Sequence, residues 1–248
     1  MNAPLTEMLS GSRRIVVFTG AGISTESGIP DFRSPGGIWS QAQPVYYDDF
    51  VQSQTARDEY WRQKSIAHRD FAGAAPNVGH RILADWEARG IIRGIITQNI
   101  DGLHQIAGNR QVLELHGTAR EVSCLGCRRR WPAEVGLDWF QAQGRAPDCP
   151  ECGSPLKHAT ISFGQSLDAD VLRSASEWTG DCDLFLALGS SLVVHPAAGL
   201  PLMAQAHGAK MVIINRDPTP LDRNADLVLR SPLGETLSQA DAGLPRDD

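Results

Sequence analysis

Runs of consecutive apolar residues alternate along the chain with amphipathic stretches that have helical spacing. The apolar runs predict buried strands at 14–19, 91–97, 111–115, 160–163, 184–188 and 210–214. Helices are expected between several of these strands, at 24–28, 49–70, 77–89, 168–178 and 196–207. Because strands that alternate with helices form parallel sheets covered on both faces, the expected fold class is α/β, with a doubly wound, mostly parallel, Rossmann-like sheet.

Two segments interrupt this alternation. Residues 34–49 are rich in Gly, Pro and Ser, which predicts a long loop of the kind that usually closes over a ligand. Residues 121–154 contain four cysteines, three consecutive arginines and several Pro and Gly residues. This change in composition predicts a small module inserted in the larger domain.

Composition and charge narrow the classes of protein to be considered. With 248 residues, 42% hydrophobic and 21% charged, the chain has globular proportions, which excludes a disordered chain, a collagen and a coiled coil. The net charge of −6 argues against broad binding to nucleic acid or anionic membranes, and the arginine run 128–130 is expected to be a solvated face. No apolar run approaches the about 20 residues that span a bilayer. The N-terminus lacks the pattern of a signal peptide, so a cytoplasmic location is expected.

Three of the predicted strands end in small or polar residues that suit a dinucleotide. Gly20, Ala21 and Gly22 follow the first strand, where glycines allow close approach to a pyrophosphate, although Gly28 stands too far along for a G-x-G-x-x-G motif. Two further groups, at the ends of strands 184–188 and 210–214, are Gly189, Ser190 and Ser191, and Asn215, Arg216 and Asp217. One adenine dinucleotide lying across these strand ends would use all three groups. The simpler interpretation is that they are ordinary turn and cap residues.

The cysteines form two C-x-x-C pairs, separated by 21 residues: Cys124 and Cys127, and Cys149 and Cys152. This spacing predicts one tetrahedral Cys₄ zinc site, and four thiolates leave no open position for catalysis. The alternative is a redox dithiol. Cys182 has no partner in this pattern and is assigned to the core.

These features give the expected division of the chain into parts. The Rossmann-like domain is expected to be discontinuous, with a smaller zinc-binding and helical domain inserted in it. The expected boundaries are 1–35, 76–120 and 158–248 for the Rossmann-like domain, 36–75 for a flexible cofactor loop and helical module, and 121–157 for the zinc-binding module.

Several long blocks of the sequence resemble the sirtuin family, in the order in which that family has them. The blocks are GAGISTESGIPDFRS at 20–34, TQNIDGLH at 97–104, HG at 116–117, GSSL at 189–192 and IN at 214–215. The resemblance spans about residues 15–217 and includes the four cysteines. It implies a bacterial-type NAD-dependent protein-lysine deacylase, which transfers the acyl group to ADP-ribose and releases nicotinamide and free lysine. NAD would be the co-substrate, and one zinc ion would be structural.

The resemblance also implies roles for individual residues. His116 would be the base for a ribose hydroxyl, Asn99 would hold the water that attacks later, and Gln98 would contact ribose. A histidine has the right pKa for such a base, although a lone histidine is more often structural. The other residues implied to bind NAD or its nicotinamide are Ser24, Ile29, Asp31, Phe32, Arg33, Ile100 and Asp101. An Asn-Asp-Gly stretch such as 99–102 is also typical of a plain turn.

The acyl-lysine substrate is implied to lie between the two domains and to pair as a strand with 162–165 and 192–195. Its binding residues would be Phe163, Gly164, Val193 and Val194. His158 and Gln165 replace a Pro and an acidic residue of many relatives, which leaves peptide preference open. Relatives that prefer succinyl groups have Tyr-x-x-Arg, whereas this chain has Gln63 three residues after Tyr60, so a neutral acyl group such as acetyl is expected. A monomer is expected.

Three other functions remain open at this point. A mono-ADP-ribosyltransferase would cleave NAD in the same pocket but leave the ribose on protein. A nucleotide-sensing module stabilised by zinc would bind NAD without turnover. The presence of His116 and Asn99 argues against this alternative. A hydride-transferring dehydrogenase is the weakest alternative, because the glycine spacing departs from that fingerprint.

Overall fold

The computed structural model describes residues 3–31 and 43–245, without the side chains of 69–72. Its larger sheet has six strands, in the order β3-β2-β1-β7-β8-β9, and every neighbouring pair is parallel. The strands are β1 (Ile15–Thr19), β2 (Ile92–Thr97), β3 (Val112–Glu114), β7 (Leu184–Leu188), β8 (Lys210–Ile214) and β9 (Leu227–Leu229). The predicted α/β class with a parallel, doubly wound sheet is therefore confirmed.

The strand order determines where a ligand can bind. The first three strands run outward from β1 in one direction, and the last three run outward from β7 in the other. The chain therefore reverses its winding between β1 and β7. In sheets of this kind the crevice at the carboxyl ends of the two central strands is the usual ligand site. The glycine loops after Thr19 and after Leu188 both open at this point.

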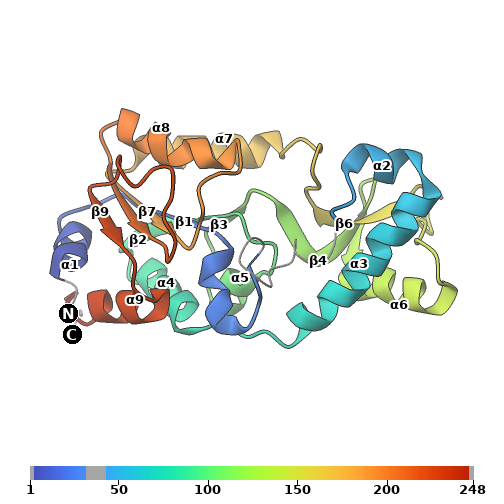
Figure 1. Cartoon of the computed structure of the whole chain (residues 1–248), viewed down its shortest axis with the longest axis horizontal. Coiled ribbons are helices and arrows are strands. Elements are labelled where there is room, and N and C mark those ends of the chain that lie inside the picture. Colours follow the sequence, from blue (N-terminus) through green and yellow to red (C-terminus); the bar gives the residue numbers. More distant parts are fainter. Residues whose placement is uncertain (1–2, 32–42, 246–248) are drawn as a thin grey trace.

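Alternation along β1 explains why helices cover both faces of the sheet. Ile15 and Val17 belong to one apolar cluster, and Val16 and Phe18 belong to a second cluster on the opposite face. Figure 1 shows helices along both sides of this sheet. The first face is covered by α1 (Ala3–Ser10), α4 (Val78–Ala88) and α9 (Leu233–Asp241), and the second by α7 (Ala169–Asp181) and α8 (Leu200–Ala206).

A second, three-stranded sheet lies at the other end of the elongated molecule (Figure 1). It is antiparallel, in the order β5-β4-β6, and is packed with three helices around one apolar cluster. These elements are β4 (Gly117–Cys124), β5 (Arg130–Pro132), β6 (Leu156–Thr160), α2 (Tyr47–Gln52), α3 (Gln54–Ala72) and α6 (Ala133–Gln143). Trp61 joins α3 to this sheet, because it is fully buried and its Nε1 donates a 3.0 Å hydrogen bond to the Leu156 carbonyl.

The prediction of a strand of the large sheet at 160–163 is wrong. Only Thr160 of this run lies in a strand, and that strand, β6, pairs antiparallel with β4 in the smaller sheet. The apolar run signals burial, but it contains no information on which sheet buries it. The chain leaves the cysteine module beside β4, and pairing with β4 satisfies its backbone.

Three other differences concern helices. The helix expected at 24–28 is replaced by two single turns, η1 (Ala21–Ile23) and η2 (Thr25–Ser27), which end at Gly28 with a φ of 83°. The helix expected at 49–70 is divided at Ser53 into α2 and α3, because Ser53 is extended. The chain from 196 to 207 forms η4 (Ala197–Gly199) and then α8. The elements that the sequence did not predict are α1, α5 (Leu103–Ala107), α6, α9, β4, β5 and β9.

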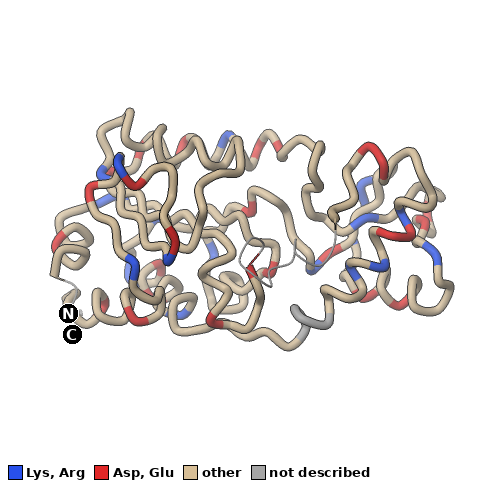
Figure 2. Tube along the Cα trace, in the orientation of Figure 1, with Lys and Arg blue, Asp and Glu red and all other residues tan. Residues whose placement is uncertain are grey.

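Figure 2 shows acidic and basic residues interspersed along the whole trace. The arginine run that follows Cys127 illustrates this, because Arg129 pairs with Glu151 at 2.8 Å and Arg130 pairs with Glu121 at 2.9 Å. The side chains of Arg129 and Arg130 are 61% and 60% exposed, as expected for a solvated face. Within the described residues, no helix combines the length and apolar character that crossing a bilayer requires.

Candidate active site and metal site

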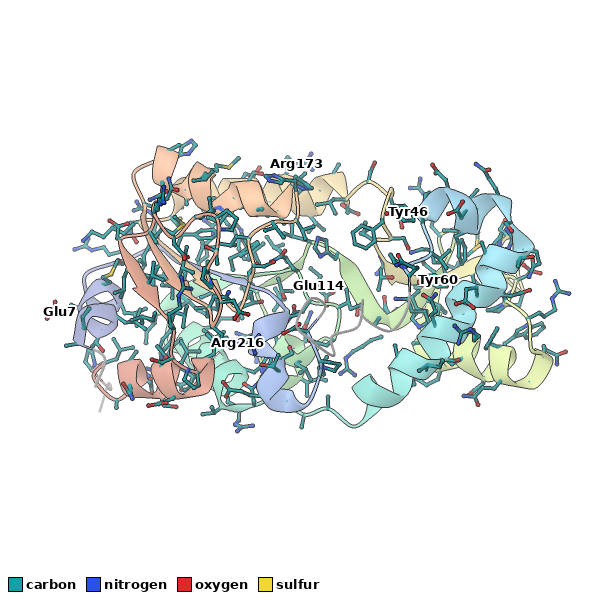
Figure 3. The ribbon with its side chains drawn as sticks, in the orientation of Figure 1. Glu7, Tyr46, Tyr60, Glu114, Arg173 and Arg216 are labelled. Atoms are coloured by element: carbon teal, nitrogen blue, oxygen red, sulfur yellow. The ribbon has the colours of Figure 1, made fainter. Side chains whose placement is uncertain are left out.

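A cavity of about 780 Å³ lies between the carboxyl ends of the parallel strands and the three-stranded sheet. Residues from the loops that follow β1, β2, β3, β7, β8 and β9 line one side of it, and residues of α3 and of the stretch after β6 line the other. In Figure 3, Arg216 marks the first side and Tyr60 marks the second. A volume of this size suits a dinucleotide or a comparable ligand.

The two glycine loops contact each other at the point where the winding reverses. Gly22 N donates a 2.8 Å hydrogen bond to the Gly189 carbonyl, and Gly20 N donates one of 3.0 Å to the Leu188 carbonyl. A Cβ on Gly20 would lie 2.7 Å from the Gly189 oxygen, and one on Gly22 would lie 2.7 Å from the Gly189 Cα. The glycines are therefore required for this contact between loops, in addition to the approach of a pyrophosphate that the sequence predicts.

The loop after β8 is fixed by an arginine that the sequence analysis missed. Arg230, just beyond β9, donates hydrogen bonds of 2.8 Å and 2.9 Å to the carbonyls of Asn215 and Asp217, and it forms an ion pair with Asp222. Arg216 pairs with Asp217 at 2.8 Å and lies 3.9 Å from Asp31. Nothing in the pattern of the sequence distinguishes Arg230 from other surface arginines.

His116 follows β3 and lines the cavity beside Gln98 and Asn99. Its Nδ1 lies 2.9 Å from the Gln98 carbonyl oxygen, and the Gln98 side chain donates a 2.7 Å hydrogen bond to Ser190 Oγ. Burial lowers the pKa of His116, and the hydrogen bond to Gln98 opposes part of that effect. At neutral pH the imidazole is therefore uncharged, with its proton on Nδ1 and Nε2 available to accept one.

Ser24, Asn99 and Asp101 form a hydrogen-bonded group next to His116. The Ser24 hydroxyl donates a 2.7 Å bond to Asp101 Oδ2, and Asn99 Nδ2 lies 3.2 Å from Ser24 Oγ and from the Gly20 carbonyl. All three side chains are buried, and Asn99 lines the cavity. The other Asp101 oxygen accepts from Leu103 N at 2.9 Å, which fixes the start of α5. Ser24 and Asp101 are not among the residues that line the cavity, so Asn99 is the member of the group whose amide can meet the carboxamide of a nicotinamide there.

A second layer of buried polar groups supports this one. Thr97 Oγ1 accepts from Asn99 N at 3.0 Å and from Thr19 Oγ1 at 2.8 Å, and Thr19 Oγ1 lies 3.0 Å from His104 Nε2. The ring of His104 lies 4.9 Å from that of His80. Burial lowers the pKa of His80 to about 4 and that of His104 to about 3, so both rings are neutral in the folded protein.

Three of the four predicted peptide-binding residues line the cavity. These are Phe163, Gly164 and Val194, whereas Val193 is not among the lining residues and is 44% exposed. Neither 162–165 nor 192–195 forms a strand in the structure. The Phe163 ring lies 5.9 Å from that of Tyr46, and its carbonyl accepts from Tyr47 N at 2.9 Å, which ties this stretch to α2.

Most of the predicted cofactor residues are brought together in this cavity. Besides those named above, Ala21, Ile29, Ile100 and Ser191 line it. Phe32 and Arg33 lie outside the described residues, as does 34–42 of the predicted loop. The residues that sequence reasoning did not assign to the cavity include Thr160, Lys64 and Ala67, together with Arg230. Tyr60, Lys64 and Ala67 have the i, i+4, i+7 spacing that places residues on one face of a helix. This spacing could have indicated that the three α3 residues line the same site.

The four cysteines predicted to hold zinc form one cluster. Their sulfur atoms all lie within 4.8 Å of one another, with Cys124 and Cys152 at 3.4 Å and Cys127 and Cys149 at 3.7 Å. Zinc–sulfur bonds of about 2.3 Å in a tetrahedron place sulfurs about 3.8 Å apart, so the donor set and spacing fit zinc. The backbone N–H groups of Gly126 and Cys127 each lie 3.3 Å from Cys124 Sγ and would stabilise a thiolate there.

The fold and the site together define a dinucleotide-binding α/β protein with an inserted metal-binding module. The Sir2 family profile matches residues 20–196, and the chain belongs to this family. The chain is 53% identical over 235 residues to an NAD-dependent protein deacetylase of Rhodopseudomonas palustris, covering 94% of this chain and 93% of the relative. It is 50% identical over 238 residues to NAD-dependent protein deacetylase 1 of Bradyrhizobium diazoefficiens, covering 94% and 92%.

Solved structures of the family have the same fold. A structure of Sir2 with a p53 peptide and NAD+ matches with a TM-score of 0.88 and 38% identity, covering 96% of each chain. A Sir2 structure bound to a propionylated peptide matches with a TM-score of 0.89 and 36% identity, covering 99% of this chain and 100% of the other.

Proposed function

We propose that this chain is an NAD-dependent protein-lysine deacylase that removes acetyl groups and releases nicotinamide, O-acyl-ADP-ribose and free lysine. The observation that carries this proposal is the neutral imidazole of His116, oriented by the Gln98 carbonyl, in a cavity shared by the glycine loops and Phe163. The relatives at 53% and 50% identity are named NAD-dependent protein deacetylases, which supports it.

The residues that form the cavity would have different roles in the reaction. NAD supplies an anomeric carbon whose leaving group, nicotinamide, already carries a positive charge. Ser24, Asn99 and Asp101 bind and orient the carboxamide of that leaving group, and Ile100 and Ile29 exclude water from it. His116 Nε2 takes the proton of a ribose hydroxyl, since Nδ1 is already engaged with Gln98.

The remaining groups would hold the two substrates. The Gly20–Gly22 and Gly189–Ser191 loops would bind the pyrophosphate and a ribose, with Gln98 beside them, and Asn215, Arg216 and Asp217 would bind the adenosine end. Asp31, with Phe32 and Arg33 after it, would complete the cofactor site. Phe163, Gly164, Val193 and Val194 would hold the acyl-lysine peptide by apolar contact and backbone hydrogen bonds.

The cysteine cluster would hold one structural zinc ion. Four thiolates close the coordination shell, and the cluster joins the end of β4 to the turn before β6, so the ion would stabilise the smaller sheet. Thiolates of this kind are kept available in a reducing compartment, which supports a cytoplasmic location. A monomer is proposed because the residues of one chain suffice to form the cavity.

The test is product analysis with one acetyl-lysine peptide and NAD. We expect equal amounts of nicotinamide, O-acetyl-ADP-ribose and unmodified peptide, detected by mass spectrometry. ADP-ribose attached to the peptide or to the enzyme, with the acetyl group intact, would instead indicate an ADP-ribosyltransferase. Formation of NADH would indicate a dehydrogenase, and either result would reject the proposal.

A further inference from the structure

The turn at 99–102, between β2 and α5, is hydrogen-bonded to β4 of the smaller sheet. Ala119 N donates a 2.8 Å hydrogen bond to the Ile100 carbonyl, and Arg120 Nε donates one of 2.7 Å to the Asp101 carbonyl. The first bond uses backbone atoms alone, so it does not depend on the side chain at 119. The second depends on a side chain, and Arg120 belongs to none of the sequence blocks that resemble the sirtuin family.

The path of β4 explains why this arginine is available for the turn. The register of β4 with β6 is interrupted between Gly117 and Val122, and the pairing of β4 with β5 begins at Glu121. Residues 118–120 therefore pair with neither neighbouring strand. In Figure 1, β4 leads from the middle of the molecule into the three-stranded sheet, so it brings a side chain of the smaller sheet to a turn of the larger one.

The aliphatic part of Arg120 lies directly on Gly102. A Cβ at position 102 would be 2.7 Å from Arg120 Cδ, which is closer than two carbon atoms of separate residues can approach. Gly102 also has a φ of 68°, in the left-handed region that favours glycine. Arg120 therefore packs against the turn as well as bonding to it.

The bond to Asp101 is the one polar contact of the Arg120 side chain within the described part of the chain. Its guanidinium forms no ion pair there, unlike those of Arg129 and Arg130. The residue is exposed overall, so its other N–H groups are open to water. Because a cationic donor strengthens a hydrogen bond to a carbonyl, this contact is the interaction through which Arg120 can act on the fold.

The effect of this contact can reach the cavity through two further hydrogen bonds. The Asp101 carboxylate accepts from the Ser24 hydroxyl at 2.7 Å, and Ser24 Oγ lies 3.2 Å from Asn99 Nδ2. Asn99 and its neighbour Ile100 line the cavity. A shift of the Asp101 backbone would therefore displace the carboxylate, and with it the amide of Asn99.

Resting on the function proposed above, we infer that Arg120 is a positioning residue for the nicotinamide end of NAD. Its bond to the Asp101 carbonyl fixes the turn, and the turn fixes the Asn99 amide that would meet the carboxamide. Arg120 is not among the residues that line the cavity, so it acts through the turn and not by touching a ligand. Nicotinamide, as a product, competes for the pocket that it leaves, so its inhibition constant measures how well that pocket is formed.

Two substitutions separate the hydrogen bond from the packing of the side chain. Arg120→Met keeps an unbranched side chain against Gly102 but has a methyl carbon where arginine has Nε. Arg120→Gln has an amide nitrogen the same number of bonds from the backbone as Nε, so it keeps a donor without the charge. Arg173→Met is the matched control, since Arg173 is exposed on α7 and pairs with Asp170 of the same helix.

The full chain and the three variants are compared by steady-state deacetylation of one acetyl-lysine peptide, with and without added nicotinamide. For Arg120→Met we expect the inhibition constant of nicotinamide to rise about fivefold, as the loss of one hydrogen bond would produce, and the KM for the peptide to change less than about twofold. Arg120→Gln should keep the inhibition constant within about twofold of the wild type. Arg173→Met should change neither quantity.

The outcomes separate this inference from the proposed function. An unchanged inhibition constant in Arg120→Met, or a peptide KM that rises equally with it, overturns the inference and leaves the proposed function intact. So does an Arg120→Gln variant that behaves like Arg120→Met, or a complete loss of turnover in Arg120→Met, because the role would then lie in charge or in folding. Deacetylation by the wild type that nicotinamide does not inhibit also overturns the inference alone. Failure of the wild type to deacetylate the peptide overturns both.

Discussion

The Nδ1 atom of His116 lies 2.9 Å from the carbonyl oxygen of Gln98, the residue that directly follows β2. A carbonyl can only accept, so this contact fixes the imidazole tautomer with Nδ1 protonated. Nε2 is then the atom that can accept a proton in the cavity. Because the Gln98 side chain also bonds Ser190 Oγ, the same residue links the base to the loop after β7.

Replacing His116 by Ala should abolish most of the deacylation and leave NAD binding largely intact. General bases contribute about 10²–10⁴-fold to a rate, and we expect kcat to fall within that range. Turnover with an acetyl-lysine peptide and the Kd for NAD, by calorimetry, are the two measurements. His207→Ala, at an exposed histidine after α8, is the control. If His116→Ala kept more than about a tenth of the activity, another group would be the base.

Stability should decline as the pH falls below the ordinary pKa of histidine. His80 and His104 have folded-state pKa values of about 4 and about 3, lower than in the unfolded chain, because burial disfavours their charged forms. Between pH 6.5 and about 4 the unfolded state therefore binds more protons than the folded state. The free energy of unfolding should be retained above pH 6.5 and lost below it, by up to about 1.4 kcal/mol per pH unit for each ring.

Urea unfolding at pH 7.5, 6 and 5 measures this dependence. Because other buried histidines, such as His158, contribute in the same direction, the comparison with His80→Gln isolates one ring. The variant should show a shallower loss of stability with acid than the wild type. Equal slopes for the two proteins would contradict the assignment of a buried neutral His80.

Replacing Gly20 by Ala should separate the two glycine loops and weaken NAD binding. The added Cβ would lie 2.7 Å from the Gly189 oxygen and 2.9 Å from the Ser190 Cα, and backbone atoms cannot move aside cheaply. We expect about 1–3 kcal/mol of destabilisation, together with a raised KM for NAD. Gly199→Ala is the matched control, since its Cβ would meet nothing within 4 Å and its φ is −82°. Equal behaviour of the two variants would show that the loops are not in contact as described.

Replacing Cys149 by Ser should remove the metal and loosen the smaller sheet. We expect one zinc per chain in the wild type and none in the variant, by atomic absorption, with increased hydrogen exchange in β4, β5 and β6. The six-stranded sheet should keep its protection, because its clusters contain no cysteine ligand. Cys182→Ser should retain the metal. Unchanged zinc in Cys149→Ser would reject the Cys₄ site.

Local patterns in the sequence predicted most of the large sheet and the glycine loops that line one side of the cavity. The position of strand β1 and of the turn at Gly20 could be predicted, because a β-branched apolar run and a glycine turn are both properties of adjacent residues. The cysteine cluster was predicted for the same reason, since metal spacing is a local signal.

Features that depend on contacts between distant segments could not be predicted in this way. Thr160 begins an apolar run that predicts a buried strand. Its pairing with Gly117 in the smaller sheet, however, depends on how the cysteine module folds back. Arg230 reaches Asn215 and Asp217 only because β9 lies beside β8. The meeting of Lys64 and Lys157 around Tyr60 requires α3 to pack on β6, which no periodicity shows.

The central claim is that His116 acts on the ribose of NAD, and a crystal structure of the chain with NAD and an acetyl-lysine peptide tests it most directly. The measured quantity is the distance from His116 Nε2 to the nearest hydroxyl of the nicotinamide ribose. We predict about 2.6–3.2 Å, directly or through one water. A ribose bound in the cavity but out of hydrogen-bonding reach of this nitrogen would contradict the claim.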